Sequence, residues 1–258
     1  MSIEQYRRYR RALKRTPFSG RHMEYAWGGL PTKLNIGWMP YSEMFDELSG
    51  EIANAINQLT DYAHRLKAWY GLVVHMDDKQ KMDIAHEFVD SIATVALNLP
   101  YVIRSRFIFA SAHLCHQANH ARERASWKDD LPLDSEIYFD TADKYGASWR
   151  RYKRFKLSVE KIGAKHYQTD TGDFRHAYNH RFSRRIVIGQ TQIVTRQVDK
   201  QTGLVRYGFG GAPALTVEVI ARLLAEQCQH CYRAFEAFQQ LIREHEGCIA
   251  LNQSEHVL

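Results

Sequence analysis

The sequence predicts an all-α protein, a multi-helix bundle of long antiparallel helices with a β-hairpin inserted near residues 185–209. Apolar residues recur at steps of three and four through most of the chain, which is the spacing of one face of a helix. β-branched residues cluster in one segment, between residues 186 and 207. Neither an internal repeat nor a clear linker interrupts the pattern. We therefore expect a single domain over residues 1–258, in which residues 1–40 form a basic N-terminal arm.

The first long helix is expected to begin near Ser42, whose hydroxyl can cap it, and Gly71 and the polar pair Asp77-Asp78 are expected to end it or to precede the next helix. Its apolar stripe covers roughly 30 residues, or about 45 Å of helix. The stripe consists of Phe45, Leu48, Ile52, Ala55, Leu59, Tyr62, Leu66, Trp69 and Val73.

Two further helices are expected between residues 79 and 127, separated at Pro100. Proline lacks a backbone N–H and its ring clashes with the preceding turn, so Pro100 should break or kink the helix. The apolar positions expected to face inward in the helix of residues 79–99 are Met82, Ala85, Phe88, Val89, Ile92 and Val95.

The C-terminal half is expected to hold two more long helices, one on each side of the hairpin. The helix of residues 134–162 keeps its phase through Tyr145, Trp149, Tyr152, Phe155, Val159 and Ile162. The helix of residues 216–246 does so through Ile220, Leu223, Gln227, Cys231, Phe235, Phe238, Leu241 and Ile242. Residues 190–198 and 204–207 flank a turn-like segment, which predicts the hairpin, with residues 186–188 as a third short strand.

The charge of the chain favours an anionic partner. Lys and Arg number 35 against 29 Asp and Glu, a net charge of +6. From Lys144 to Arg185 there are twelve Lys and Arg and three acids, so this segment alone carries +9. No apolar segment follows the basic N-terminus, and no stretch of about 18 apolar residues lacks charge. We therefore expect no membrane partner and a cytoplasmic protein, in which the four cysteines are reduced.

The run from Arg175 to His180 places an arginine, two histidines and an asparagine inside two helical turns of this basic segment. Asp170 or Thr171 can cap the helix. At about 100° per residue, Arg175, His176, Asn179 and His180 fall on one polar arc, opposite a largely apolar one.

This arc suits the cleavage of RNA by its own 2′-OH. A base must remove the hydroxyl proton, an acid must protonate the leaving 5′ oxygen, and a fixed positive charge must stabilise the phosphorane. Histidine serves either proton role near neutral pH, and arginine binds phosphate through a forked set of donors. Asparagine can orient a phosphate oxygen or a histidine. The chemistry needs no metal, and we expect no cofactor.

The run resembles the R-x4-6-H motif of the HEPN superfamily, helical domains that include many metal-independent RNases. The motif carries over as Arg175, His176 and His180, with His176 where the family often has Asn. Some toxins of the family have a tyrosine two residues after the histidine, where this chain has Phe182. The resemblance does not extend to the hairpin or the N-terminal arm.

The resemblance implies a metal-independent endoribonuclease that acts as a toxin or in antiviral defence, with RNA as substrate and an antitoxin protein as partner. It also implies a homodimer in which two copies of the motif form one cleft. The catalytic residues would then be Arg175, His176, Asn179 and His180. The nearby basic residues expected to bind the nucleic acid are Arg150, Arg151, Lys153, Arg154, Arg181, Arg184 and Arg185.

Two other functions fit parts of the sequence. The first is a non-catalytic module in which the basic segment binds nucleic acid or an acidic protein. The second is a helical metal-binding protein. Its ligands would come from Cys228, Cys231, His113, Cys115, His116 and His120, or from the pairs Asp61–His64 and Asp83–His86. We favour the ribonuclease, because the cysteines fall beside an apolar stripe where reduced cysteine is common, and helical di-metal sites use glutamates.

Overall fold

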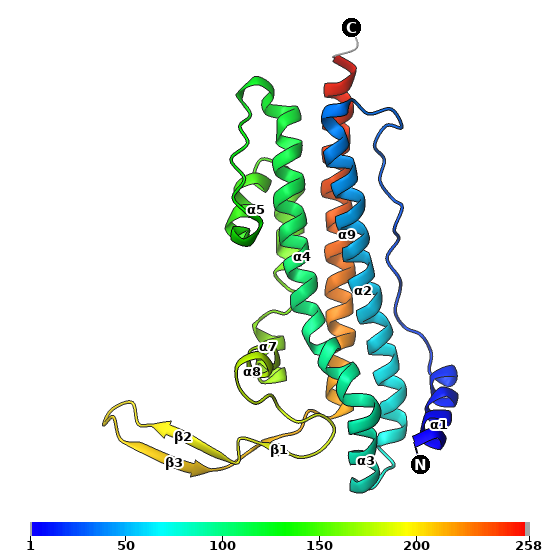
Figure 1. Ribbon diagram of the computed structural model, residues 1–258, viewed down its shortest axis with the longest axis vertical. Coiled ribbons are helices and arrows are strands. Elements are labelled where there is room, and N and C mark those ends of the chain that lie inside the picture. The colour runs from blue at the N-terminus through cyan, green and yellow to red at the C-terminus, as the bar shows by residue number, and fades with distance from the viewer. Residues whose placement is uncertain (1, 256–258) are drawn as a thin grey trace. The chain divides into compact units, whose positions relative to one another are not determined.

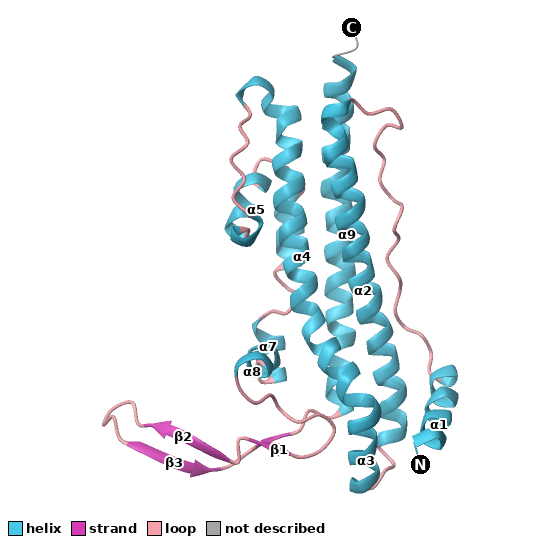
Figure 2. Ribbon diagram, viewed as in Figure 1, coloured by secondary structure: helices cyan, strands magenta, loops and turns pink. Residues whose placement is uncertain are grey.

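The computed structural model describes residues 2–255 and confirms an all-α bundle with a small β-hairpin (Figures 1 and 2). The α-helices are α1 (Ser2–Arg15), α2 (Met39–Val73), α3 (Asp78–Ile84), α4 (Asp90–Glu123), α5 (Phe139–Gly146), α6 (Tyr152–Val159), α7 (Lys165–Thr171), α8 (Phe174–His180) and α9 (Val217–Glu255). Short turns are the 3-10 helices η1 (Ile36–Trp38), η3 (Arg124–Ser126) and η4 (Asp134–Glu136) and the π-helical turn η2 (Ala85–Val89). The strands are β1 (Gln190–Thr191), β2 (Val194–Val198), β3 (Val205–Phe209) and β4 (Ala212–Pro213).

The chain divides into two compact units, each assembled from three separate segments. The first unit holds the residues up to Gly20 together with Leu59–Leu99 and Gly163–Glu226. The second holds Arg21–Gln58, Pro100–Ile162 and the residues from Gln227 onwards. The long helices α2, α4 and α9 each contribute residues to both units.

Aromatic contacts hold the first unit together. Tyr9 of α1 stacks on Trp69 of α2 with ring centroids 4.4 Å apart and an angle of 4° between the planes. Tyr6 stacks on Phe88 at 6.3 Å. Buried Tyr167 of α7 donates its hydroxyl to the carbonyl oxygen of Leu97 at 2.9 Å. The first part of the basic N-terminal segment is thus a helix packed by its tyrosines, and its arginines stay exposed.

The core of the second unit is a cluster of phenylalanines from three helices. Phe107 of α4, Phe155 of α6 and Phe238 of α9 lie with their ring centroids 5.7 to 5.8 Å apart. The extended segment before α2 covers this core through Trp27, which meets the ring of Phe238 edge-on at 6.0 Å. A Cβ at the adjacent Gly28 would lie 2.6 Å from the ring of Phe45, so the close approach of this segment requires glycine.

The predicted stripes of α2 and α9 face the core. In α9 every predicted position is buried: Ile220, Leu223, Gln227, Cys231, Phe235, Phe238, Leu241 and Ile242. The start of α2 differs from the prediction, because the helix begins at Met39, directly after a 3-10 turn that Asn35 caps, and not at Ser42.

Pro100 does not break the helix, which was one of the two outcomes predicted for it. One helix, α4, continues from Asp90 through Pro100 to Glu123. Pro100 itself and the neighbouring Leu99 and Tyr101 are buried. The packing of these residues therefore outweighs the local cost of a proline inside a helix.

The predicted helix of residues 134–162 is instead two short helices, α5 and α6. A turn at residues 147–151 separates them, and the ring of Tyr152 lies against Gly146, where a Cβ would come within 2.2 Å of it. The predicted apolar residues are nevertheless all buried.

The inward face predicted for residues 79–99 is partly wrong. Met82 is 61% and Val95 44% exposed, whereas the smaller Ala93 and Ala96 are fully buried. Small side chains allow neighbouring helices to approach closely, so a ranking by hydrophobicity alone selects the wrong residues here.

The hairpin is confirmed, with antiparallel β2 and β3 in the register Val194↔Phe209 to Val198↔Val205. Residues 186–188 do not form the predicted third strand. The amide of Ile188 donates to the carbonyl of Ile186 at 2.8 Å around Val187, whose φ of 69° is unusual for a β-branched residue. A short β1–β4 pair closes the base of the hairpin instead.

Among the described residues, one continuous helical stretch, Asp78–Ser126, contains a window long and apolar enough to cross a membrane. Of that window 44% is buried inside the protein. Core helices of soluble proteins satisfy the same test, so the stretch is weak support for a membrane span.

Candidate functional site

The predicted motif lies on α8, a seven-residue helix in the first unit. Asp170 and Thr171, the predicted caps, belong to the preceding helix α7, and Asp173 stands at the N-cap position with a left-handed φ of 50°. Phe174 anchors the helix, because its side chain is buried and its ring stacks on Tyr178 with centroids 5.9 Å apart.

The motif residues face away from this anchor. The side chains of Arg175, His176, Asn179 and His180 are all exposed. The imidazole rings of His176 and His180 lie one helical turn apart, with centroids separated by 4.9 Å and planes tilted by 46°. The helix therefore presents two imidazoles side by side, next to a guanidinium and an amide, on one solvent-facing arc.

The three arginines that follow α8 differ in how they are used. Arg181 and Arg185 are exposed. Arg184 is half-buried, and its guanidinium donates to the carbonyl oxygens of Pro213 at 2.8 Å and Asp170 at 3.4 Å. The guanidinium of Arg184 thus fastens the chain after α8, while the other two arginines add positive charge to the surface of this unit.

The remaining predicted basic residues form a surface of the second unit. Arg150, Lys153 and Arg154 are exposed and line a shallow depression of about 470 Å³ that Lys161 also borders. Arg151 is half-buried, and its backbone amide donates to a carboxylate oxygen of Glu244 at 2.9 Å. The side chains bordering this depression supply positive charge suited to a phosphate backbone.

No family model, curated protein or solved structure matches the chain. The resemblance to HEPN domains therefore depends on the residues of α8 and their helical setting.

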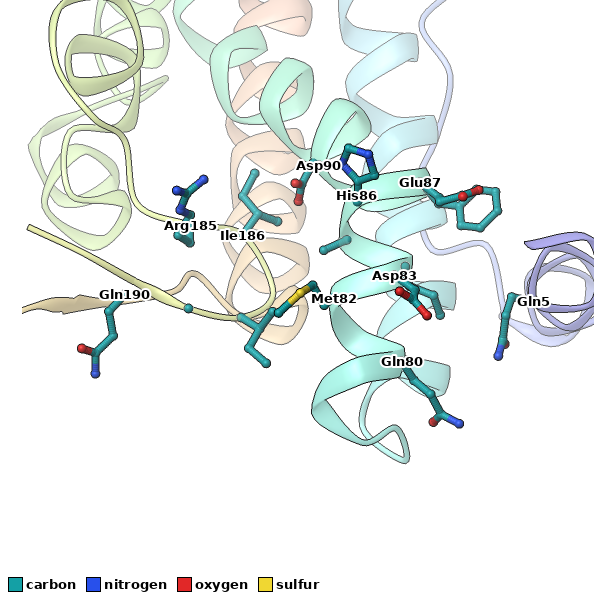
Figure 3. A pocket seen from close by; sticks show the side chains of 15 residues that line it. Gln5, Gln80, Met82, Asp83, His86, Glu87, Asp90, Arg185, Ile186 and Gln190 are labelled. Atoms are coloured by element: carbon teal, nitrogen blue, oxygen red, sulfur yellow. The ribbon is translucent and has the colours of Figure 1, made fainter. Parts of the chain in front are cut away.

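A cavity beside the π-helical turn is a second candidate site (Figure 3). It has a volume of about 800 Å³ and lies within the first unit. Arg185 and Asp90 lie on one side of the turn and Gln5 on the other. Its walls are formed by Gln5, Gln80, Met82, Asp83, Ile84, Ala85, His86, Glu87, Phe88, Asp90, Arg185, Ile186, Ile188, Gly189 and Gln190.

Asp90 places an unsatisfied buried oxygen in this cavity. Its amide donates to the carbonyl of Ala85 five residues back, which creates the π turn, and its Oδ1 atom is buried without a hydrogen-bond partner. Burial raises the pKa of Asp90, and nearby His86 and Arg185 partly offset the increase. The buried Oε1 of Gln5 also lacks a donor. Both atoms are acceptors, so the cavity favours an occupant that carries N–H or O–H groups.

This cavity was not predicted, although the sequence contains a signal for it. Asp83, His86, Glu87 and Asp90 recur at helical steps of three and four, which marks a polar face. The π turn and the tight turn at Val187 could not be read from the sequence. Such irregular backbone gathers at functional sites more often than elsewhere.

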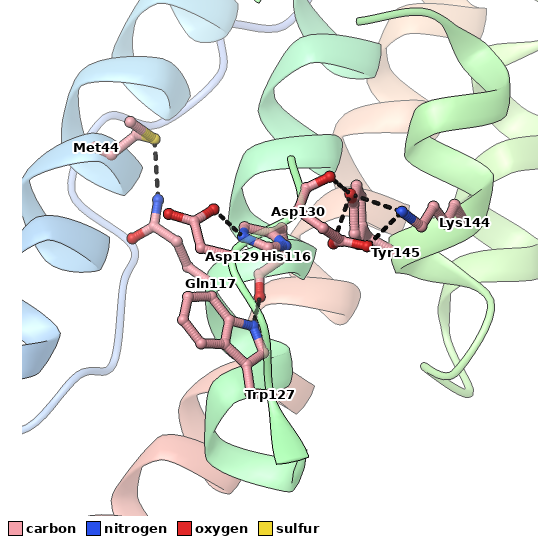
Figure 4. A network of polar contacts seen from close by, with 8 residues as sticks. All are labelled: Met44, His116, Gln117, Trp127, Asp129, Asp130, Lys144 and Tyr145. Carbon is pink, nitrogen blue, oxygen red and sulfur yellow. Dashed lines mark hydrogen bonds and ion pairs between the residues drawn. The ribbon is translucent and has the colours of Figure 1, made fainter. Parts of the chain in front are cut away.

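The residues considered for zinc are used differently. His113 bonds to Asp134 at 3.1 Å and His116 to Asp129 at 3.0 Å. In Figure 4, Asp129 and Asp130 from the same loop reach His116, Lys144 and Tyr145, while Trp127 donates its indole N–H to the His116 carbonyl. Within the part of the chain that the structure describes, no three His, Cys, Asp or Glu residues are grouped to hold a metal ion. These contacts instead fasten the loop after α4 to its own unit.

Proposed function

We propose that the chain is a metal-independent endoribonuclease of the HEPN type whose reacting groups are the exposed residues of α8. The contact between the rings of His176 and His180, 4.9 Å apart beside exposed Arg175, is the observation that carries the proposal. Two adjacent imidazoles can accept and donate protons near neutral pH, and a guanidinium stays charged and binds phosphate.

In the proposed reaction a base removes the proton of a ribose 2′-OH. The oxygen attacks the adjacent phosphorus, the bond from phosphorus to the 5′ oxygen breaks, and an acid protonates that oxygen. The products are a 2′,3′-cyclic phosphate and a 5′-hydroxyl. We assign His180 as the main acid–base group, Arg175 as the phosphate clamp and Asn179 as a supporting donor. His176 is the second proton carrier or orients its neighbour.

A homodimer belongs to this proposal. The four residues lie on a single exposed arc, which supplies one wall of a reaction site. A second copy of α8 facing the first would add the other wall and exclude water from the phosphate. The role in toxin–antitoxin or antiviral systems, which the HEPN resemblance implies, is part of the same proposal.

The test is cleavage of a labelled single-stranded RNA by the purified chain in EDTA. We expect cleavage that ends in a cyclic phosphate and that stops when the ribose at the cut site is replaced by 2′-deoxyribose. His180→Ala should lower the rate about 10²- to 10⁴-fold, the range of a lost acid–base group.

His75→Ala is the matched control, because His75 is an exposed histidine of the same unit outside the motif. Cleavage that survives His180→Ala, or that requires a metal, contradicts the proposal. Salt-sensitive RNA binding without any cleavage would favour the non-catalytic binding module instead.

A further inference from the structure

The β2–β3 hairpin has one face that is apolar and aromatic. Residues directly opposite each other in an antiparallel pair share a face, so the register groups Val194 with Phe209, Arg196 with Tyr207, and Val198 with Val205 on the same side. The opposite side carries Thr195, Gln197, Arg206 and Gly208. The paired part of the hairpin is therefore two-sided, and the large apolar side chains of β2 and β3 lie on one surface.

This apolar face is open to solvent. Phe209 is 89% and Tyr207 68% exposed, and the three valines are each about half exposed. Figure 1 shows the ribbon extending beyond helices α3, α7 and α8 of the same unit. A two-stranded hairpin is only marginally stable by itself, and a contiguous exposed apolar patch usually marks an interaction site.

The tip of the hairpin is held in a defined conformation. One carboxylate oxygen of Asp199 accepts bonds from the backbone amides of Gln201 and Thr202 and from the Thr202 hydroxyl, at 2.8 to 2.9 Å. Gly203 has a φ of 70°, a conformation that glycine adopts without strain. These turn contacts thus favour the register that places the aromatic residues on one face.

The arrangement of the two rings indicates the chemistry of the occupant. Tyr207 and Phe209 are two residues apart on β3, so they rise from one face at a spacing of about 7 Å. Gly208 lies between them. A Cβ added at Gly208 would be on the opposite face, 3.1 Å from the side-chain nitrogen Nε2 of Gln197. Two exposed rings at this spacing on a strand can each stack on one base of an unstacked nucleic-acid strand.

The charge of the hairpin favours the same occupant. Between Gln190 and Pro213 the chain carries Arg196, Lys200 and Arg206 against one acid, Asp199. Arg196 stands directly opposite Tyr207 on the aromatic face. A second copy of the chain would bring the same cations to the interface, where like charges repel, whereas a polyanion would be attracted.

We propose that this face binds single-stranded RNA, with Tyr207 and Phe209 each stacking on one base and Arg196 contacting the backbone. The inference deepens the proposed ribonuclease function by naming how its substrate is held. It depends on that function for the choice of RNA as the polyanion. Because stacking needs no chemistry at α8, binding can be measured without cleavage.

The experiment measures the affinity of the full chain for a labelled 2′-O-methyl RNA of about twelve nucleotides by fluorescence anisotropy. Such RNA cannot be cut by 2′-OH attack. Loss of one base–aromatic stack is worth about 1–3 kcal/mol, so Tyr207→Ala and Phe209→Ala should each raise Kd about 5- to 150-fold. Tyr207→Phe and Phe209→Tyr keep a ring and should bind as the unmodified chain does.

Leu204→Ala is the matched control, since Leu204 is an exposed apolar residue of the hairpin that lies outside the paired residues of the proposed face. It should change Kd less than twofold. Unchanged RNA affinity in both aromatic-to-alanine variants overturns the inference. The inference is also overturned if light scattering shows that Tyr207→Ala or Phe209→Ala converts a dimer to a monomer while the RNA affinity is unchanged. That result would mean that a second copy of the chain covers this face.

The two proposals can fail separately. If the chain never cleaves RNA but Tyr207→Ala weakens RNA binding, the hairpin inference is supported and the ribonuclease proposal is contradicted. If His180→Ala abolishes cleavage while Tyr207→Ala and Phe209→Ala bind RNA as the unmodified chain does, the ribonuclease proposal is supported and the hairpin inference is contradicted.

Discussion

One histidine of the second unit and a pair of histidines in the first unit have opposite surroundings. In the second unit, His245 of α9 is fully buried, with Tyr41 Oη 3.0 Å from its Nδ1 and the Cys115 sulfur 3.6 Å from its Nε2. Burial, reinforced by the charge of Arg122, lowers the pKa of His245 to about 3. In the first unit, His176 and His180 are exposed and contact each other.

The difference shows that packing decides what a histidine can do. His245 has both ring nitrogens occupied and stays neutral through the physiological pH range, so it acts as a polar core group. Exposed imidazoles remain accessible to a substrate and to protons from solvent. The thirteen histidines of the sequence therefore carry little functional information until their burial is known.

The largest expected effect is a difference in the free energy of unfolding between His245→Ala and His180→Ala. His245→Ala removes a buried ring packed 4.3 Å from the Trp149 ring centroid and leaves the Tyr41 hydroxyl without its partner. We expect it to lower the free energy of unfolding by about 3 kcal/mol, as measured by urea denaturation. The same substitution at His180 should change it by less than about 0.5 kcal/mol. Equal losses at the two positions would show that α8 is packed as tightly as the core.

A second prediction concerns acid. The folded-state pKa of His245, about 3, lies below its ordinary value of about 6.5, so between these values the unfolded chain binds a proton that the folded chain does not. The contribution of His245 to the free energy of unfolding is fully present above about pH 6.5 and decreases as the pH falls towards 3. The expected loss at pH 5 is about 2 kcal/mol.

The measurement compares urea denaturation of the unmodified chain and His245→Gln from pH 8 to pH 5. Glutamine is polar and does not titrate, so the difference between the two proteins should shrink by about 2 kcal/mol over this range. Other titrating groups, such as His113, are present in both proteins and cancel. A difference that does not vary with pH would mean that His245 has the same pKa in the folded and unfolded chains.

The sequence predicted the features that follow from regular periodicity. The α9 stripe from Ile220 to Ile242 is buried as expected, and the hairpin turns at Asp199–Gly203. On α8, the 100° spacing placed His176 and His180 on an arc that is exposed in the structure. Each of these depends only on local geometry repeated along one element.

What the sequence did not predict depends on contacts between distant residues. Pro100 stays within a helix because its surroundings are buried, and the split between α5 and α6 follows from the ring of Tyr152 lying on Gly146. The cavity at Asp90 needs both a π turn and the loop at Val187, which come from separate segments. No spacing rule links residues so far apart.

The smallest effect concerns the contact between the two exposed histidines. The position after the arginine is often Asn in HEPN motifs, so we expect His176→Asn to keep the proposed RNA cleavage within about tenfold, or about 1.4 kcal/mol of activation free energy. His180→Asn should lose at least about 100-fold. The measurement is kcat/KM from pH 5 to pH 9 with the single-stranded RNA. If His176→Asn is as inactive as His180→Asn and also loses one limb of the pH profile, the pair would supply both acid and base from one copy of α8. A second copy would then no longer be needed for the proton transfers.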